Sequence, residues 1–257
     1  MGDEQIESKH APAVGRERKI LRERGVEFVE VEDEPVHVEQ LRNAYVRVYK
    51  VSIAPGSVTL YHRHRKDTLY VVLQGGYNIS DEPFRQRQRM PGLPRSLRLR
   101  TRLTMAFQRL STGAVNIPTA TCVMQYHESH PLIHRVCAPS SNQQALSLLG
   151  IEILPRDRAR TASVDRSPLD AHGFTLEYRD ARVRVHRLRL GPGEATGVKR
   201  VEPPALIVPL RGRFERRSAV DRARIDPGHV HWLPGHTSLE LVNVSALQGE
   251  MLLVALL

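Results

Sequence analysis

The chain repeats itself at a constant offset, so that Val46 corresponds to Val183. Segment 46–56 matches segment 183–193, and segment 69–75 matches segment 206–212 at the same offset and without a gap. In both copies an alternating run ends at Pro-Gly, and a second β-rich run ends at Gly. Alternation of apolar and polar residues with a period of two, bounded by Pro and Gly, is typical of β-strands. A match that keeps its register through these turns indicates an all-β unit duplicated in tandem.

The composition limits the classes of protein to which this chain can belong. With 257 residues, 40% hydrophobic and 26% charged, the chain can bury a large core and is neither disordered nor collagen-like. Its longest apolar run, 251–257, is far shorter than the roughly 18 residues of a membrane helix. The N-terminus lacks an apolar signal core, and two cysteines, Cys122 and Cys137, are too few for a disulfide framework. We therefore expect a cytoplasmic protein without a membrane span.

The net charge of +10 is concentrated in one segment. Residues 84–110 contain eight arginines and no Asp, Glu or Lys, which leaves 30 basic and 28 acidic side chains elsewhere. The segment lacks lysines and interleaved aromatic residues, so it argues against a nucleic-acid site. A solvated loop is the interpretation we favour, and a local error in the coding frame stays open. Upstream, residues 15–24 have a helix-like pattern, whereas 26–32 alternate as a strand does.

The spacing of glycine and histidine resembles the cupin superfamily, whose first motif is G-x5-H-x-H-x3-E-x6-G. In the first copy, Gly56 and Gly75 enclose His62 and His64 at this spacing, and Thr68 holds the Glu position. The second copy keeps the glycines at the same spacing and has other residues at the two His positions and the Glu position: Lys199, Val201 and Ala205.

The second cupin motif, G-x5-P-x-G-x2-H-x3-N, is matched in part by both copies. In the first copy, His134 holds the His position and Ala138 the Asn position. The second copy matches at Gly228, Pro234 and Asn243 and has Leu239 where His belongs. The stretch from Gly75 to His134 is more than twice as long as the stretch from Gly212 to Leu239, so the first copy carries an insertion.

The resemblance implies a bicupin, with two tandem double-stranded β-helix (jelly-roll) barrels. We expect a short N-terminal extension at 1–35, a first cupin domain at 36–155 with the Arg-rich insertion 84–110, and a second cupin domain at 156–257 that has lost its metal ligands. The histidines of the second copy, His229, His231 and His236, are expected in turns or at the surface. Trp232 is expected to pack in the core or in a pocket wall.

The two histidines of the first motif project to one face of a strand, because side chains at i and i+2 do so. The resemblance implies that His62, His64 and His134 bind one divalent metal ion. Thr68 is a poor ligand, and Asp67 would face the opposite side of the strand. A site of three neutral imidazoles is similar to that of cupin thiol and β-diketone dioxygenases. Fe(II) is therefore favoured, while Zn, Ni, Mn and Cu stay open.

Two functions stay open at this stage. One is a non-haem Fe(II) dioxygenase-like enzyme acting on a small anionic substrate, with Thr68, Tyr70 and His130 lining the pocket and His127 as a less favoured ligand than His134. The other is a non-catalytic bicupin that binds a small molecule or serves a regulatory or structural role. In both cases the partner is a small molecule rather than nucleic acid or a membrane. Exposed barrel edges would allow a homodimer.

Overall fold

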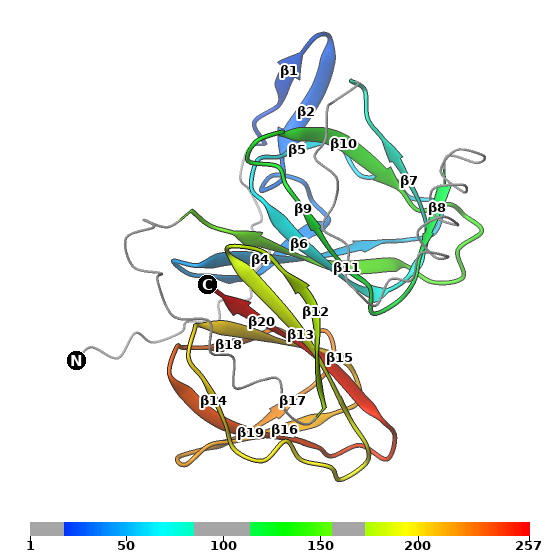
Figure 1. Ribbon diagram of the computed structural model, residues 1–257. Coiled ribbons are helices and arrows are strands. Elements are labelled where there is room, and N and C mark those ends of the chain that lie inside the picture. Colours follow the sequence, from blue (N-terminus) through cyan, green and yellow to red (C-terminus); the bar gives the residue numbers. More distant parts are fainter. Residues whose placement is uncertain (1–17, 85–113, 156–172) are drawn as a thin grey trace.

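The computed structural model describes residues 18–84, 114–155 and 173–257, and all regular elements in these ranges are β-strands (Figure 1). The strands of the first copy are β1 (Leu21–Glu23), β2 (Val26–Glu30), β3 (His37–Arg42), β4 (Val46–Ile53), β5 (His62–His64), β6 (Thr68–Gln74), β7 (Gly76–Asp81), β8 (Ala114–Ile117), β9 (Cys122–Gln125), β10 (Leu132–Cys137) and β11 (Leu146–Ile153). The strands of the second copy are β12 (Phe174–Arg179), β13 (Val183–Leu190), β14 (Lys199–Val201), β15 (Ala205–Arg211), β16 (Phe214–Arg217), β17 (Arg222–Ile225), β18 (His231–Leu233), β19 (Thr237–Asn243) and β20 (Gly249–Leu256).

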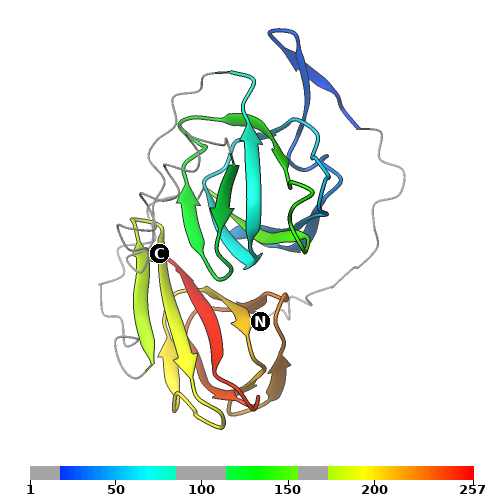
Figure 2. The ribbon, with the colours of Figure 1, turned by 90° about the vertical axis from the view of Figure 1, so that its right-hand side faces the viewer.

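Each copy forms a barrel from two sheets. In the first barrel a six-stranded sheet, in the order β1-β2-β5-β10-β7-β8, faces a five-stranded sheet, β3-β4-β11-β6-β9. In the second barrel the sheets are β12-β13-β20-β15-β18 and β14-β19-β16-β17. The two barrels are clearly separate in both ribbon views (Figures 1 and 2). The expected all-β fold with two tandem barrels is confirmed.

The strands follow the offset seen in the sequence. Strands β4, β5 and β6 correspond to β13, β14 and β15 at this constant offset, end for end. The offset also extends upstream of the sequence match, because β3 and β12 are related in the same way. The pairing register agrees as well, since His62 lies opposite His134 in the first barrel and Lys199 lies opposite Leu239 in the second.

The turns repeat with the strands. Asn43 Oδ1 accepts the backbone N–H of Val46 at 3.0 Å, and Asp180 Oδ1 accepts that of Val183 at 2.9 Å. Such side-chain acceptors replace a backbone partner in tight turns. These equivalent bonds start β4 and β13 at the same point, which explains why the register holds across the duplication.

The largest apolar core lies between the barrels. The five-stranded sheets of the two barrels contribute to one buried cluster, for which Leu69 and Ile151 in the first and Leu206 and Val254 in the second are examples. Trp232 packs against this cluster, with its ring centroid 5.3 Å from that of Tyr45. The predicted core position of Trp232 is therefore confirmed, and it is an inter-barrel position.

The helix predicted from the pattern at 15–24 is wrong for the residues of this segment that the structure describes. Residues 21–23 form β1, which pairs antiparallel with β2, and Arg24 and Gly25 close the hairpin with φ of 47° and 84°. Both turn residues are left-handed, as the type I′ turn of a two-residue hairpin requires, and strand pairing overrides the local pattern. Strand β2 then lies parallel to β5, so this part of the N-terminal extension joins the first barrel.

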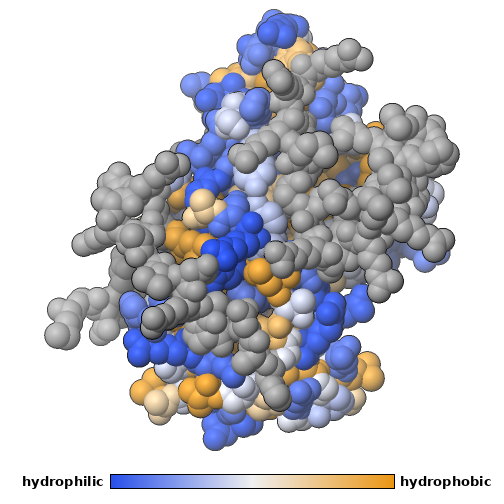
Figure 3. Space-filling view, in the orientation of Figure 1, coloured by the Kyte–Doolittle hydropathy of each residue, from blue (hydrophilic) through white to orange (hydrophobic). Residues whose placement is uncertain are grey.

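The Arg-rich insertion lies outside the described residues apart from Phe84. The described ranges contain no helix that is long and apolar enough to cross a membrane. On the face shown in Figure 3, hydrophobic residues of the described surface lie in separate groups among hydrophilic ones. Cys122 and Cys137 are both free, in agreement with the absence of a disulfide framework.

Candidate metal site

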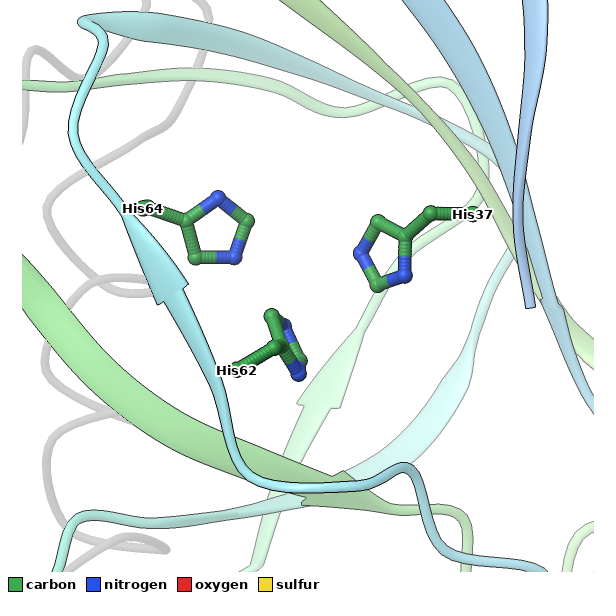
Figure 4. A group of neighbouring side chains, drawn as sticks. All are labelled: His37, His62 and His64. Carbon is green, nitrogen blue, oxygen red and sulfur yellow. The ribbon is translucent and has the colours of Figure 1, made fainter. Parts of the chain in front are cut away.

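A cluster of histidines lies inside the first barrel and is contributed by both of its sheets. His62 and His64 project from β5, and each side chain has about 1% exposure. His37, the first residue of β3, approaches from the facing sheet (Figure 4). One ligand atom from each of these three histidines lies within 4.8 Å of the other two. The imidazoles of Figure 4 converge on a common centre, which is the arrangement a bound cation requires.

His134 lies beside this group. Its ring centroid is 4.7 Å from that of His62 and 5.1 Å from that of His64. Its Nδ1 lies 3.0 Å from Ser80 Oγ, while its Nε2 is buried and has no hydrogen-bond partner among the described residues. The structure thus brings the three histidines predicted from the sequence together, although His134 is outside the tightest group of ligand atoms.

His37 was not predicted from the sequence because it precedes both cupin motifs. The available signal was the extension of the constant offset upstream, which makes His37 and Phe174 equivalent at the starts of β3 and β12. His37 is 4.7 Å from His62 and 6.0 Å from His64, measured between ring centroids. A fourth imidazole of the first barrel therefore comes from outside the two motifs.

His127 is the fifth imidazole. It follows β9, is 2% exposed, and stacks on His64 with ring centroids 5.2 Å apart. Its Nε2 is buried without a hydrogen-bond partner among the described residues. His130, which we expected at the pocket, lies in the same loop with its Nδ1 2.9 Å from Ser129 Oγ. Of the two neighbours of His134 weighed from the sequence, His127 is the one that contacts the cluster.

The other predicted pocket residues differ in their roles. The Tyr70 hydroxyl lies 3.2 Å from Nδ1 of His64, so this side chain contacts the cluster. Thr68 is fully buried, and its hydroxyl donates to the Lys66 carbonyl at 2.8 Å. Asp67 forms an ion pair with Arg182 of the second barrel. Neither position therefore supplies the carboxylate that the cupin motif has at residue 68.

Glu34 is the acidic group that contacts the cluster. Its side chain is buried, and Oε2 lies 2.7 Å from Nδ1 of His37. Burial opposes ionisation, but the hydrogen bonds from His37 and the Val36 backbone and the nearby imidazoles hold the pKa of Glu34 below its ordinary value. The carboxylate is thus charged and reaches the cluster through His37.

Four of the imidazoles, those of His62, His64, His127 and His134, are held in the neutral form. Burial, together with repulsion from His37, lowers the pKa of His62 to about 4. Burial lowers the pKa of His127 to about 4, against the attraction of Asp67. The pKa values of His64 and His134 are also well below the ordinary value, first because of burial and then because of the neighbouring histidines. Metals bind neutral imidazole, so these four side chains can bind a cation without first losing protons.

These residues fit a divalent transition metal ion. Imidazole is a ligand for iron, zinc, nickel and copper, and three ligand atoms already lie within 4.8 Å of one another. The partnerless Nε2 of His134 is a further buried nitrogen beside them, and a buried polar atom without a partner is costly. The geometry and protonation of this cluster therefore both fit metal binding.

The second barrel has no histidine at the positions equivalent to His37, His62, His64 and His134. Phe174 replaces His37, and the counterparts of His62, His64 and His134 are Lys199, Val201 and Leu239. Three of these four residues, all but Lys199, belong to or pack against the apolar core of that barrel. The predicted surface histidines are partly as expected: His229 is exposed, and His236 occupies a turn with φ of 61° and bonds Glu202, whereas His231 is half-buried in β18.

Comparisons with known proteins agree with the architecture. No protein-family model matches the sequence, and neither does any curated protein. Among solved structures, oxalate decarboxylase aligns with a TM-score of 0.52 at 9% identity, over 85% of this chain and 74% of that protein. AerE from Microcystis aeruginosa aligns with 0.48 at 11% identity over 87% and 98% of the chains. A cupin 2 conserved barrel protein from Leptotrichia buccalis gives 0.45 at 11% identity over 86% and 88%. Taken with the duplicated barrels, the alignment on oxalate decarboxylase shows that this chain has the bicupin fold.

Proposed function

We propose that the first barrel binds a divalent transition metal ion and that the protein is a metal-dependent, dioxygenase-like enzyme acting on a small anionic molecule. The convergence of His37, His62 and His64 in the barrel interior, with ligand atoms within 4.8 Å, carries this proposal. Fe(II) is the favoured ion, because an all-imidazole set with a neutral Thr68 at the carboxylate position is the one that the thiol and diketone dioxygenases use. The partnerless Nε2 of His134 supports its place among the ligands.

A metal ion at this site supplies Lewis acidity and open positions where an anionic substrate and dioxygen meet. The residues of the chain position the imidazoles and exclude water from them. His62 and His64 are held by the short strand β5, and Tyr70 orients His64 through its hydroxyl, 3.2 Å from Nδ1. Burial excludes water from the imidazoles and keeps them neutral.

The second barrel serves as a structural partner in this proposal. Arg182 binds Asp67 of the first barrel and Glu128, the residue that follows His127 in its loop. The shared apolar cluster joins the five-stranded sheets of the two barrels. The second barrel thereby supports the wall of the first that carries β6 and β9. A cytoplasmic location and a homodimer remain part of the proposal, with a small molecule as the partner.

Metal analysis of the purified protein tests the proposal. The wild type is expected to contain close to one ion per chain, and the double variant His62→Ala/His64→Ala none. The matched control is His229→Ala/His231→Ala, which removes a second His-x-His pair from the other barrel. An absence of metal from the wild type, or equal metal in both double variants, would contradict metal binding by the first barrel.

Oxygen consumption by the iron-loaded protein then tests the activity. A panel of thiols, β-diketones, and small hydroxy and keto acids covers the anionic chelators that such a site would take, and oxalate is included because one structural neighbour acts on it. Uptake that depends on one of these compounds and on His62 and His64 supports an enzyme. Tight binding of a compound without turnover or oxygen uptake supports the non-catalytic bicupin instead.

A further inference from the structure

Glu34 and His37 form a buried acid–imidazole pair at the edge of the histidine cluster. Their side chains are 1% and 4% exposed, and the carboxylate Oε2 lies 2.7 Å from Nδ1 of His37. A carboxylate has no proton to donate when it is charged, so Nδ1 of His37 carries the hydrogen of this bond. In the neutral imidazole, the form that binds a metal, the lone pair of His37 is therefore on Nε2.

The same carboxylate also restrains the strand that carries His62. Glu34 Oε1 accepts the backbone N–H of Leu60 at 3.2 Å, and the Leu60 carbonyl lies 2.9 Å from Nδ1 of His62. A carbonyl can only accept, so His62 also has its proton on Nδ1 and its lone pair on Nε2. Oε2 additionally accepts the backbone N–H of Val36 at 2.8 Å. One buried carboxylate thus orients two imidazoles from facing sheets.

Nearby negative charge would strengthen the binding of a divalent ion in this barrel. Thr68 is neutral, and the carboxylate of Asp67 is neutralised by Arg182. Glu152 is likewise paired, with Arg47 at 3.1 Å. Glu34 contacts an imidazole of the cluster instead of a guanidinium, so its charge is not cancelled by an arginine within the described contacts.

The second barrel indicates that His37 belongs with the ligands and not with the scaffold. Residues that both barrels need are kept across the duplication, as the Pro-Gly turns at 55–56 and 192–193 are. Position 37 changes to Phe174, which packs on the apolar core of the second barrel. His37 is thus replaced in the barrel in which the counterparts of His62 and His64 are also replaced.

We propose that His37 is the fourth imidazole ligand of the metal site and that Glu34 is its positioning residue, so that the carboxylate absent from position 68 is supplied indirectly through His37. This inference rests on metal binding by the first barrel. Metal-bound histidines usually donate their second N–H to a carboxylate or carbonyl, and loss of such a partner weakens metal affinity 10- to 100-fold. The Glu34–His37 contact has that geometry.

The experiment compares Glu34→Gln and His37→Gln with the wild type and with Glu202→Gln. The last is a matched control, since Glu202 makes a 2.6 Å contact with Nδ1 of His236 on the exposed surface of the second barrel. Affinity for Co²⁺ is measured by chelator competition, and the visible spectrum of the Co²⁺-loaded protein reports the number and geometry of nitrogen ligands. Circular dichroism and thermal unfolding of the metal-free proteins identify any variant that fails to fold.

We expect Glu34→Gln to lose 10- to 100-fold in affinity, His37→Gln to change the Co²⁺ spectrum, and Glu202→Gln to match the wild type. If the wild type binds no Co²⁺ or other divalent ion, the proposed function itself fails. If the wild type binds and both first-barrel variants keep its affinity and spectrum, only the inference fails. A loss in Glu34→Gln with an unchanged His37→Gln spectrum would refute His37 as a ligand. Should Glu34→Gln not fold, the His37→Gln spectrum alone decides whether His37 is a ligand.

Discussion

Acid should destabilise the metal-free protein through its buried histidines, and His127 gives the clearest test. Burial lowers the pKa of His127 to about 4 in the folded state, whereas an unfolded chain protonates near 6.5. Between these values the unfolded state binds a proton that the folded state does not. The free energy of unfolding must therefore fall as the pH drops below about 6.5, and must go on falling until the folded imidazole is itself protonated near 4.

The size of the effect follows from the two pKa values. Between pH 7 and pH 5 the loss for one such histidine is about 2 kcal/mol. His62, whose pKa burial and His37 lower to about 4 as well, adds a similar amount. The metal-free wild type should thus lose about 4 kcal/mol over this range from these two groups. His127→Gln should lose about 2 kcal/mol less than the wild type.

Urea unfolding at pH 7, 6 and 5, with chelator present, measures this difference. His229→Gln is the control, since His229 is exposed in the other barrel, and its pH dependence should follow that of the wild type. Parallel curves for the wild type and His127→Gln would refute the reasoning. A pKa near 6.5 for His127 in a histidine NMR titration would do so independently.

The remaining predictions concern packing, the contact between the barrels and the cysteines. Gly150→Ala should lower the free energy of unfolding by about 3 kcal/mol, because the new Cβ would lie 2.2 Å from the buried ring of Tyr49. In the control Gly191→Ala, the nearest atom to the new Cβ is 3.4 Å away, so chemical unfolding should show a loss of under about 1 kcal/mol. Arg182→Gln should lower the free energy of unfolding by about 2 kcal/mol, because it leaves Asp67 without its cation. The surface control Arg213→Gln should change it by less than about 0.5 kcal/mol. Equal losses in the two variants would contradict the role of the inter-barrel ion pair. Burial raises the pKa of Cys122 to about 12, so this thiol should resist a reagent that modifies the half-buried Cys137 of the native protein. Mass spectrometry of the labelled peptides measures both reactions, and preferential labelling of Cys122 would contradict the prediction.

The fold could be predicted from the sequence because its main signals are local. Alternation and Pro-Gly turns are properties of neighbouring residues, and the constant offset requires only a comparison of the sequence with itself. The strands at 46–53 and 183–190 begin and end as the repeat requires. The hairpin at 21–30 was only half predicted. Its second strand alternates, but its first strand is charged and is determined by pairing with the second across the Arg24–Gly25 turn.

The candidate site was predictable only where its residues share a motif. His62 and His64 are two residues apart on one strand, so their common direction follows from strand geometry. His37 reaches the same centre from the facing sheet, and His127 from a loop after β9. Their positions depend on how two sheets close into a barrel. Nothing in the local sequence of either residue reports that closure.

The two barrels show how one scaffold can hold either a polar or an apolar interior. In the second barrel the interior is mainly apolar and includes Phe214, Leu239 and Met251, with one buried histidine, His186, beside Phe174. The first barrel has a smaller interior cluster, which includes Tyr49 and Leu146, beside five histidines. Burying imidazoles contributes little to stability and costs free energy at low pH. The first barrel offsets this cost at its outer face, where its five-stranded sheet joins the core shared with the second barrel. The second barrel contributes to that core through its own five-stranded sheet, so the contact between the barrels stabilises the barrel whose interior holds the histidines.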